Sequence, residues 1–432
     1  MTPAARLSAA IDIIEALEAQ RIPAAQALKE WGTAHRFAGS GDRAAIAGLV
    51  WDVLRRRASS AYLMGSETPR ARLLGMLRLE RGMDADAIAA LCDGGRFAPQ
   101  ALDETERTAL ASGSLAGAPA HVAGDYPEWL DAQLAAVFGE DRVAEATAMA
   151  SRAPLDLRVN TLKAKREKVQ GSLKHLGAKP PPWSPIGLRI ELGADARNPG
   201  LHSEEDFLKG AVEVQDEGSQ LAALFSAAKP GEQVIDLCAG AGGKTLALAA
   251  MMDGKGRLIA TDRDKRQLAP IHERLSRAGV HNAEVRAPKG EAEPLAEIKA
   301  SADLVLIDAP CSGTGTWRRN PDAKWRIRPG ALELRLKDQV EVLDRAAGMV
   351  KPGGRIAYIT CSVLPAENNE QVRAFIARHP EFAVVPPEET ASVLWDKAEA
   401  FAAAALRSDE GWLLTPRRTG TDGFFVSVLR KT

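Results

Sequence analysis

The sequence is poor in cysteine. Its 432 residues include only Cys92, Cys238, Cys311 and Cys361. Four cysteines do not make a disulfide framework in a chain of this length, and their scarcity indicates a reducing, cytoplasmic compartment. No two of them have the Cys-x-x-Cys spacing of a zinc site, and no histidine cluster accompanies them. We therefore expect no bound metal.

The sequence also lacks an excess of either charge and any long apolar run. Lys and Arg number 56 and Asp and Glu 57, a net charge of −1, so only a local basic patch could bind nucleic acid. No run of about 18 uncharged apolar residues is present, and charges interrupt the first 20 residues. We expect neither a membrane span nor a signal peptide. The 45% of apolar residues is enough for two or three folded domains.

The pattern of apolar residues divides the chain into three parts. Residues 1–145 have apolar residues at three- and four-residue steps, which predicts an all-helical domain. Residues 146–211 predict a small α+β segment, with strands at 155–162 and 187–192. Residues 212–432 alternate strand and helix. This alternation predicts an α/β domain with a Rossmann-like, mostly parallel sheet and helices on both faces.

Five apolar segments of the third part predict the strands of its sheet. They are residues 232–238, 256–262, 303–310, 354–362 and 423–431. In an open parallel sheet, ligands bind beyond the carboxyl ends of the strands. The residues that follow these strands are therefore the first candidates for a functional site.

A glycine-rich turn, DLCAGAGGKT at 236–245, follows the first of these strands. Its glycines let a ligand approach the backbone, and Asp262, at the end of the next strand, is placed to accept hydrogen bonds from ribose hydroxyls. Thr245 stands where the dinucleotide fingerprint needs glycine, and Cys238 where the phosphate-binding P-loop needs it. The turn therefore suits S-adenosylmethionine. The alternative is a tight turn without a ligand.

Two cysteines follow neighbouring predicted strands. Asp308 and Cys311 come after one strand and Cys361 ends the next, whereas we interpret Cys238 as a packing residue and assign Cys92 no role. A lone cysteine is usually an inert buried thiol, but two beside an adenosine site favour chemistry. A thiolate that adds to carbon 6 of a pyrimidine makes carbon 5 nucleophilic, and a base must later remove the carbon 5 proton. Asp308 is the candidate for assisting at ring nitrogen 3.

The stretch between Cys311 and Lys337 is rich in basic residues, with two tryptophans between them. Basic residues bind phosphates, and aromatic rings stack on unpaired bases, so the stretch predicts an RNA contact. The alternative is a solvated loop with two packing tryptophans. The tryptophans are Trp317 and Trp325, and the basic residues are Arg318, Arg319, Lys324, Arg326, Arg328, Arg335 and Lys337.

Seven motifs together resemble the RsmB/Sun family of RNA 5-methylcytosine methyltransferases, in its bacterial ribosomal RNA branch. They span about 155 to 430, and residues 1–140 look like the NusB-like RNA-binding domain of that branch. The motifs are RVNTLK (158–163), VQDEGSQLAAL (214–224), DLCAGAGGKT (236–245), TDRDKRQL (261–268), DAPCSGTG (308–315), RRNPDAKW (318–325) and TCSVLPAENN (360–369).

The resemblance implies a role for each matching residue. Cys361 would be the nucleophile, Cys311 would assist product release, and Asp308 and Lys244 would contact the target cytosine, while the carbon 5 base stays open. The positions implied at the cofactor are Asp236, Cys238, Ala239, Gly240, Gly242, Gly243, Lys244, Asp262, Arg263, Arg266 and Asp308. Those implied in RNA binding are Arg158, Asn160, Trp317, Arg318, Arg319, Lys324 and Trp325.

The chain departs from the family pattern at two places. Ala241 replaces a proline that is usual in the glycine turn, so we expect a looser turn with cofactor binding kept. The third strand region, 284–290, contains Arg286, Ala287 and Pro288 where the family commonly has an acid that meets the adenine amine. Adenine recognition would then fall to a backbone group or to weaker contacts.

We therefore expect a monomeric, S-adenosylmethionine-dependent enzyme that methylates carbon 5 of a cytosine in small-subunit (16S) ribosomal RNA, through a covalent Cys361–cytosine intermediate. Two alternatives stay open: the same chemistry on transfer RNA, and a catalytically weak RNA-binding assembly factor. An ATP-using P-loop enzyme is disfavoured by Cys238 and by the lack of an acidic magnesium site.

Overall fold

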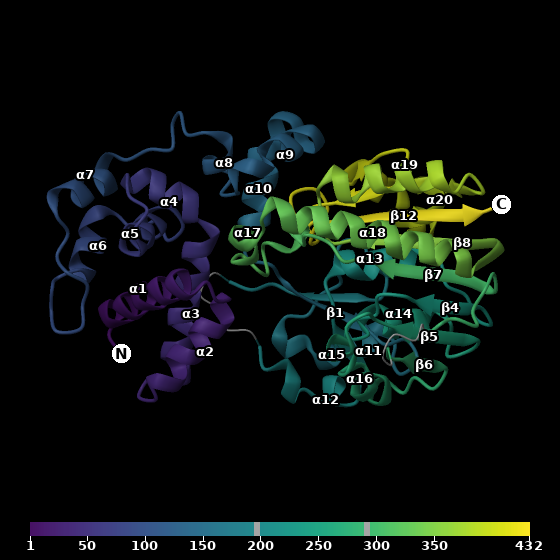
Figure 1. Cartoon of the computed structure of the whole chain (residues 1–432). Coiled ribbons are helices and arrows are strands. Elements are labelled where there is room, and N and C mark those ends of the chain that lie inside the picture. The colour runs from purple at the N-terminus through teal and green to yellow at the C-terminus, as the bar shows by residue number, and fades with distance from the viewer. Residues whose placement is uncertain (194–198, 289–293) are drawn as a thin grey trace. The chain divides into compact units, whose positions relative to one another are not determined.

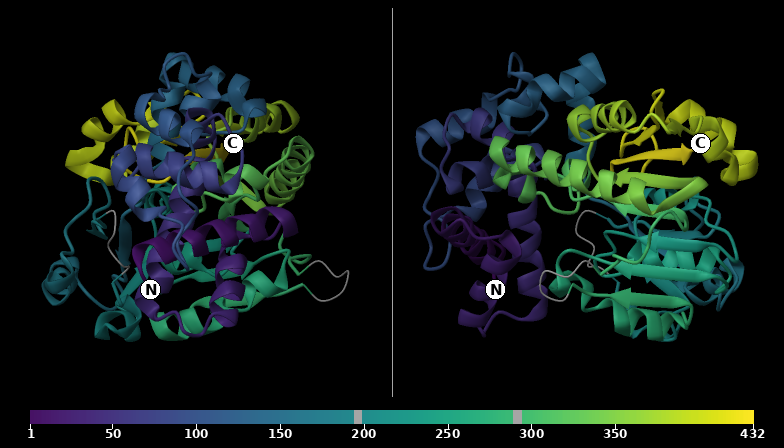
Figure 2. Two further views of the ribbon diagram at one scale, coloured as in Figure 1. Left: turned by 90° about the vertical axis from the view of Figure 1, so that its left-hand side faces the viewer. Right: turned by 45° about the vertical axis from the view of Figure 1, so that its right-hand side comes forward.

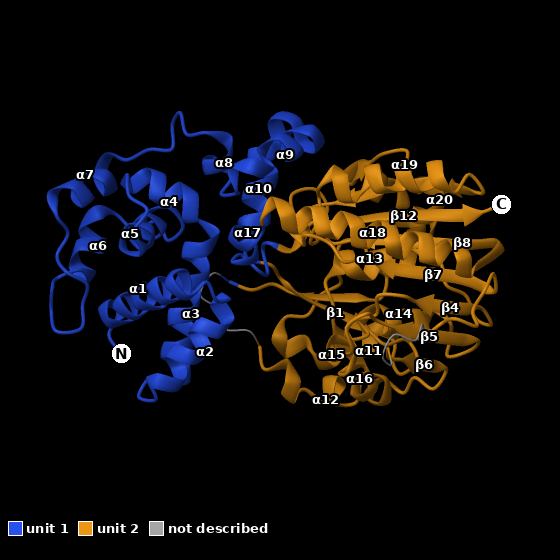
Figure 3. Ribbon diagram, in the orientation of Figure 1, with its two compact units in different colours: residues 1–152, 193–197, 317–327 blue, residues 153–192, 198–316, 328–432 orange. Residues whose placement is uncertain are grey.

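The computed structural model describes residues 1–193, 199–288 and 294–432. Contacts divide the chain into two compact units (Figures 1 and 3). The first consists mainly of residues 1–152 together with 317–327. The second holds nearly all of the remaining chain. In the described part, no helix is long and apolar enough to cross a membrane.

The first unit is all-helical, as the sequence predicted. Side chains cap several of its helices: the Thr2 hydroxyl accepts the N–H of Ala5, and Asp103 and Glu106 form a capping box. The apolar faces meet in one buried cluster. The helices are α1 (Pro3–Gln20), α2 (Ala24–Ala34), α3 (Ser40–Arg55), α4 (Arg57–Met64), α5 (Pro69–Leu79), α6 (Ala85–Leu91), α7 (Glu104–Ser112), α8 (Ala120–Ala123), α9 (Asp131–Phe138), α10 (Arg142–Ala150) and α17 (Ala323–Arg326), with 3-10 turns η1 (Glu128–Leu130) and η2 (Gly139–Asp141).

Residues 317–327 come from the later part of the sequence, yet they pack within the helical unit. The indole N–H of Trp325 donates to the carbonyl of Leu54 at 2.7 Å. The guanidinium of Arg55 donates to the carbonyl of Arg318 at 2.8 Å. Both bonds are made to the last turn of α3, so this segment completes the end of that helix.

The second unit contains a small antiparallel sheet in the order β2-β1-β3. Its strands are β1 (Leu155–Val159), β2 (Gly187–Ile190) and β3 (Val212–Val214), and its helices are α11 (Arg166–Ser172) and α12 (Glu205–Leu208), with 3-10 turns η3 (Lys174–Leu176) and η4 (Leu201–Ser203). The small α+β segment expected from the sequence is therefore present. Gly177, at φ 75°, ends its first helical segment in the left-handed region.

The large sheet has the order β10-β11-β12-β8-β7-β4-β5-β6, with β9 paired to β12. Strands β6, β5, β4, β7 and β8 are parallel, and β12 is antiparallel to β8. This is the expected Rossmann-like sheet. The strands are β4 (Gln233–Asp236), β5 (Arg257–Thr261), β6 (Ala283–Arg286), β7 (Ala302–Asp308), β8 (Val350–Thr360), β9 (Phe382–Val384), β10 (Leu406–Arg407), β11 (Trp412–Leu414) and β12 (Phe424–Lys431).

Helices lie on both sides of this sheet (Figure 2). Helix α13 packs against α14, and α18 packs against α19. The chain order reverses between β4 and β7, and ligands bind at such a switch point. The helices are α13 (Glu217–Phe225), α14 (Gly243–Met251), α15 (Lys265–Leu268), α16 (Ile271–Ala278), α18 (Pro329–Met349), α19 (Asn369–Arg378), α20 (Pro387–Ala391) and α21 (Ala398–Ala404), with 3-10 turns η5 (Thr314–Thr316), η6 (Pro365–Glu367) and η7 (Ser392–Lys397).

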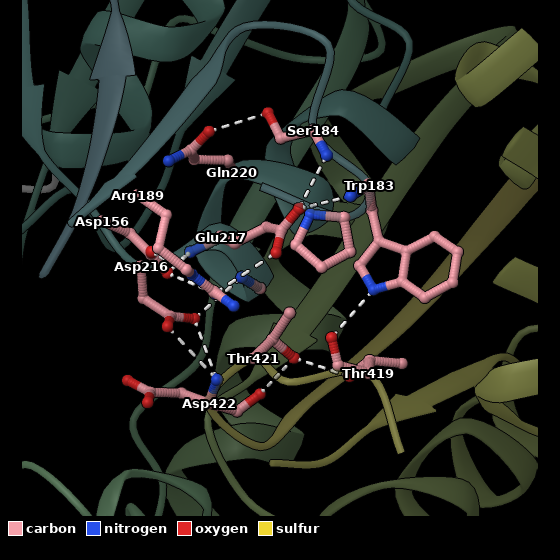
Figure 4. Close-up of polar contacts among 12 residues, drawn as sticks. Asp156, Trp183, Ser184, Arg189, Asp216, Glu217, Gln220, Thr419, Thr421 and Asp422 are labelled. Atoms are coloured by element: carbon pink, nitrogen blue, oxygen red, sulfur yellow. Dashed lines mark hydrogen bonds and ion pairs between the residues drawn. The ribbon is translucent and has the colours of Figure 1, made fainter. Parts of the chain in front are cut away.

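A buried polar network joins the small sheet to the start of α13 (Figure 4). One oxygen of Glu217 accepts the backbone N–H groups of Trp183 and Ser184, each at 2.7 Å. Arg189, on β2, donates to Asp156, on β1, at 2.6 Å and to Glu217 at 3.3 Å. Burial raises the pKa of Glu217 to about 7. The network fixes the position of α13. The residues just before this helix form part of the wall of the cavity described below.

The same network reaches the loop before β12 (Figure 4). The indole of Trp183 donates to the carbonyl of Thr419 at 2.8 Å, and the N–H of Asp422 donates to the carboxylate of Asp216 at 3.1 and 3.2 Å. Segments from three distant parts of the sequence are thereby held together.

The packing of residues 317–327 generates a stability prediction. Trp325→Ala removes the hydrogen bond to Leu54 and apolar contacts with the helical cluster, so we expect a loss of about 2 kcal/mol in local stability. Hydrogen exchange of the α3 amides should accelerate about 30-fold, because about 1.4 kcal/mol corresponds to a factor of ten. Exchange in β7 should not change.

The control is Trp395→Ala, in the second unit, where the side chain is 73% exposed. We expect no change beyond about twofold in either unit for this variant, since exposed side chains contribute little. Unchanged exchange of α3 in Trp325→Ala would contradict the packing described.

Candidate functional site

A cavity of about 730 Å³ lies beyond the carboxyl ends of β4, β5 and β7. Its volume is typical of a small-molecule site. Its walls come from the turn after β4, the turn after β5, the loop after β7, helix α18 and the segment before α13. The lining residues are Val214, Gln215, Asp216, Ser219, Leu237, Cys238, Ala239, Gly240, Ala241, Gly243, Lys244, Asp262, Arg263, Asp264, Gln267, Arg274, Asp308, Pro310, Leu334, Arg335, Asp338, Glu341, Val342 and Arg345.

The glycine turn has a backbone that other residues would not adopt readily. Gly240 and Gly242 have φ values of 50° and 87°. A Cβ atom on Gly242 would lie 2.4 Å from the side chain of Ile271. The N–H of Gly240 donates to one oxygen of Asp262 at 2.8 Å, and the other oxygen accepts the N–H of Asp264 at 2.8 Å. Asp262 therefore ties the turns after β4 and β5 together beside the cavity.

Arg274, on α16, is a site residue that the sequence analysis missed. Its guanidinium donates to the carbonyl of Ala241 at 2.8 Å and to the carboxylate of Glu213 at 3.1 Å. Arg274, which is itself paired with Glu213, thus stabilises the glycine turn at Ala241, the residue that replaces the proline usual in the family. Only the tertiary fold brings α16 to this turn, so no local sequence signal marks Arg274.

Asp236, at the end of β4, is completely buried. One of its oxygens accepts the hydroxyl of Thr245 at 2.7 Å, and the other is buried with no hydrogen-bond partner in the described chain. Burial raises the pKa of Asp236 to about 7. Asp236 itself does not line the cavity, whereas the next two residues, Leu237 and Cys238, do.

Lys244 and Asp308 form an ion pair across the switch point. The Lys244 ammonium lies 2.6 Å from a carboxylate oxygen of Asp308, and 5.2 Å from the centre of the Phe424 ring. The Lys244 side chain is buried, whereas that of Asp308 is about one-third exposed. Both residues line the cavity, so both face any ligand bound there.

The two candidate cysteines meet at the ends of β7 and β8. The Sγ atoms of Cys311 and Cys361 lie 3.3 Å apart. Backbone hydrogen bonds hold the two loops together. The N–H of Ala309 donates to the carbonyl of Ile359 at 2.8 Å, and the N–H of Gly315 donates to the carbonyl of Cys361 at 2.9 Å. The hydrogen bond with Cys361 and burial raise the pKa of Cys311 well above its ordinary value.

Glu367 anchors the Cys311 loop, and the sequence analysis did not single it out. It is completely buried, and one oxygen accepts the N–H of Ser312 at 2.7 Å and the amide of Gln339, on α18, at 3.1 Å. Its own carbonyl accepts the hydroxyl of Tyr358 at 2.7 Å. Its position in the motif after Cys361 was the only available signal.

Of the two arginines that follow β5 and were expected at the cofactor, only one lines the cavity. Arg263 lines the cavity, where its guanidinium pairs with Asp338 of α18 at 2.9 Å. Arg266 does not line the cavity, whereas Asp264 and Gln267 do. Neither of these last two was expected, because the sequence pattern does not show which way this short turn faces.

The two early residues expected in RNA binding are buried in the second unit. Arg158 is completely buried and donates to the side chain of Gln215 at 2.6 Å, and burial lowers its pKa to about 10. The amide of Asn160 donates to the carbonyls of Gly210 and Ala278, each at 2.9 Å. These contacts hold the small sheet to the neighbouring elements and leave little surface for a ligand.

Most of the later residues expected in RNA binding are buried inside the helical unit. The side chains of Trp317, Arg318 and Lys324 are 2%, 4% and 1% exposed. Burial lowers the pKa of Lys324 to about 8. Trp325 is partly covered and packs on the helical cluster, and Arg319 is partly exposed. These contacts favour the alternative in which the two tryptophans are packing residues. Of the five residues, Arg319 and Trp325 keep the most exposed surface for RNA.

The expected adenine-side strand is β6, which pairs with β5. The hydroxyl of Thr261 donates to the carbonyl of Arg286 at 2.6 Å, and the guanidinium of Arg286 pairs with Glu284 and Glu297. Residues 289–293, which include the end of the 284–290 stretch, lie outside the described residues. Within the described chain, no group of three or more His, Cys, Asp or Glu side chains is arranged to hold a metal ion.

Two family models match the chain. Residues 223–430 match the model of the 16S rRNA methyltransferase RsmB/F, and residues 126–197 match the ferredoxin-like domain of RsmF/B-like methyltransferases. Together they cover more than half of the chain. The chain belongs to the RsmB/F methyltransferase family. The match to the ferredoxin-like domain extends across the domain boundary expected at 145. The assignment of a NusB-like domain and the domain boundaries at 145 and 211 stay predictions.

Curated relatives of this RsmB/F chain have related names. The "Ribosomal RNA small subunit methyltransferase B" of Salmonella typhi is 36% identical over 263 residues, and that of Salmonella newport is 35% identical over 261 residues. Each match covers 60% of this chain and 59% of the relative.

Solved structures share the fold of this RsmB/F chain. The crystal structure of PH0851 has a TM-score of 0.72 and 26% identity, covering 100% of this chain and 99% of that one. A methyltransferase homolog protein from Pyrococcus horikoshii has a TM-score of 0.58 and 26% identity, covering 72% and 98%. NSun6 from Pyrococcus horikoshii, solved with SFG, has a TM-score of 0.59 and 21% identity, covering 71% and 98%, and shows the fold alone.

The buried carboxyl of Asp236 generates a pH prediction. Its pKa of about 7 in the folded protein exceeds the value near 4 of an unfolded chain, so the folded protein binds this proton more tightly. The free energy of unfolding that it contributes is therefore highest below about pH 4 and falls as the pH rises to about 7. Relative to wild type, Asp236→Asn should gain about 2–4 kcal/mol of stability between pH 4 and 8, measured by urea unfolding.

Asp303→Asn is the control of opposite sign. Burial alone would raise the pKa of Asp303, but hydrogen bonds from Lys351 and from the N–H of Gln233 outweigh it and lower that pKa. The wild-type carboxylate stabilises the fold once it is ionised. Asp303→Asn should therefore lose stability relative to wild type as the pH rises through 4. Parallel pH profiles for wild type and Asp236→Asn would contradict the account of Asp236.

Proposed function

We propose that the protein is an S-adenosylmethionine-dependent RNA (cytosine-5)-methyltransferase that acts on small-subunit (16S) ribosomal RNA. The observation that carries the proposal is the pair of Sγ atoms of Cys311 and Cys361, 3.3 Å apart at the strand ends next to the cavity. A single thiol would fit many enzymes. Two thiols beside a nucleoside-sized cavity fit a reaction that forms and then releases a covalent adduct with a base.

The residues around the cavity fit S-adenosylmethionine. The glycine turn leaves its backbone open to a ligand, and the carboxylate of Asp262 is placed for the ribose hydroxyls. When bound, this cofactor supplies an electrophilic methyl group. Neither nucleotide phosphate motif is complete, which disfavours the dinucleotides and ATP.

The chain's own residues account for activation of the base. The Cys361 thiolate adds to carbon 6 of the cytosine, and the electron pair of the 5,6 double bond moves to carbon 5. Asp308, in its protonated form, donates a hydrogen bond to ring nitrogen 3 and eases this addition, and the Lys244 ammonium, 2.6 Å away, supplies the proton to the carboxyl. After carbon 5 has been methylated, a base removes its proton, the double bond re-forms and the Cys361 thiolate leaves. Cys311, beside that sulfur, assists the release.

Two observations bear on the substrate. The curated relatives carry the name of a small-subunit ribosomal RNA methyltransferase, which supports 16S ribosomal RNA over transfer RNA. The stretch Arg286-Ala287-Pro288, where the family commonly has an acid, is the observation that favours the second candidate, an assembly factor with weak turnover. Against it, Cys361, Cys311, Asp308 and Lys244 are all present and close together, and a protein without turnover has no need of this arrangement.

The proposed roles of the cysteines are separable by mutation. Cys311→Ala should form the adduct but release it slowly, so a protein–RNA species resistant to denaturant should accumulate when S-adenosylmethionine is present. Cys361→Ala should be inactive without such a species, because the nucleophile is gone. The measurement is a denaturing gel of protein incubated with unmodified 16S ribosomal RNA.

Cys92→Ala is the matched control, since Cys92 is a cysteine buried in the core of the helical unit. It should retain methylation within about twofold, as for other substitutions outside an active site. Failure of Cys311→Ala to form any adduct with an RNA that wild type methylates would contradict the covalent route.

A further inference from the structure

The cations in the turn after β5 and at the start of α15 line two different hollows. Arg263 and Asp264 border both the cofactor cavity and a second hollow of about 490 Å³. Lys265 and Arg266 border only the second hollow, whose far side is formed by Pro288, after β6. The two hollows are therefore neighbours that share one short turn. Pro288 belongs to the stretch in which the family resemblance implies an adenine contact, but neither it nor Lys265 and Arg266 line the cofactor cavity.

The second hollow is strongly cationic. Three of its five lining residues are cations, and only Asp264 is acidic. Lys265 and Arg266 are exposed, and neither side chain forms an ion pair with any residue that the structure describes. Arg263 pairs with Asp338 at 2.9 Å, and Asp264 accepts the N–H of Arg266 at 2.8 Å. Two cations that have no ion-pair partner among the described residues thus line the same hollow.

We propose that this hollow binds the phosphodiester backbone of the RNA substrate, through Lys265 and Arg266. The inference rests on the proposed function, and it specifies how the RNA is held. Cationic side chains that lack protein partners are the usual contacts of phosphate groups. The target base must reach the cysteines beside the cavity, so the backbone next to that base must pass along the rim of the same sheet edge. The turn after β5 belongs to that rim.

The proposal gives Arg266 a different role from the one implied by family resemblance. It no longer contacts the cofactor, from whose cavity its side chain is absent, and becomes an RNA-positioning residue. Asp264 adds specificity, because its carboxylate repels a phosphate that sits too deep, towards the cofactor cavity. The hollow therefore favours a backbone that runs along its outer side.

The test is the double variant Lys265→Gln with Arg266→Gln. Its control is Lys229→Gln with Lys255→Gln, which removes the same charge from exposed positions just before β4 and β5, at the opposite edge of the sheet. Binding of in vitro transcribed, unmodified 16S ribosomal RNA is measured from 50 to 200 mM salt, together with the kinetics of its methylation and the Kd of S-adenosylmethionine.

We expect the test variant to bind RNA about tenfold more weakly, and its plot of log K against log salt to be shallower by about 1.4, or about 0.7 for each lost phosphate contact. KM for RNA should rise by a similar factor, with kcat and the cofactor Kd unchanged within about twofold. The control should match wild type. The kinetic split separates RNA positioning from a merely structural effect, which would also change kcat and cofactor binding.

The outcomes distinguish this proposal from the proposed function. If wild type methylates the RNA and the test variant binds and reacts like the control, the phosphate site is wrong and the proposed function stands. If the test variant loses affinity for S-adenosylmethionine, Arg266 belongs to the cofactor site and the proposal is overturned. If wild type binds RNA in a manner that depends on Lys265 and Arg266 but does not methylate it, the site stands and the proposed function fails.

Discussion

The alignment of the parallel strands at one edge of the sheet is the constraint on which the site depends. Neighbouring strands lie about 4.8 Å apart, so residues that follow β7 and β8 must be close in space. Cys311 and Cys361 are 50 positions apart in the sequence, yet their sulfur atoms are 3.3 Å apart. The same alignment brings Lys244, which follows β4, to Asp308, which ends β7. The pairs meet because backbone hydrogen bonds fix the register, not because their side chains attract one another.

The features that the sequence predicted are those governed by local pattern and by this alignment. The alternation of strands and helices predicts the sheet, and the glycines predict the turn after β4. Because ligands bind beyond the carboxyl ends of parallel strands, Asp262 and the two cysteines are candidates for the site. Arg274 and Glu367 were missed because each depends on a tertiary contact. Arg274 reaches the glycine turn from α16, and Glu367 reaches the Cys311 loop from behind β8. Neither direction is encoded in a short stretch of sequence.

In the basic and aromatic stretch after Cys311, the sequence predicted RNA contacts for residues that are mostly buried in the structure. Its composition is typical of a nucleic-acid contact, but burial depends on what else the chain supplies. Here the end of α3 offers the carbonyl of Leu54 to Trp325, and residues 317–327 fill a place in the helical core. The loop of Cys311 therefore continues directly into a segment that belongs to the helical unit. Within the described chain, cations without an ion-pair partner are found instead at Lys265 and Arg266, at the start of α15, in a motif whose family resemblance implied the cofactor.

The central claim is that the sheet edge transfers a methyl group to a cytosine of small-subunit ribosomal RNA. The most direct test is transfer of tritium from labelled S-adenosylmethionine to total RNA from cells that lack the gene, followed by bisulfite mapping of the product. The account predicts label on carbon 5 of one cytosine in 16S ribosomal RNA. Label confined to transfer RNA would contradict the substrate, and no label in any RNA, from a protein that binds both S-adenosylmethionine and RNA, would contradict the claim itself.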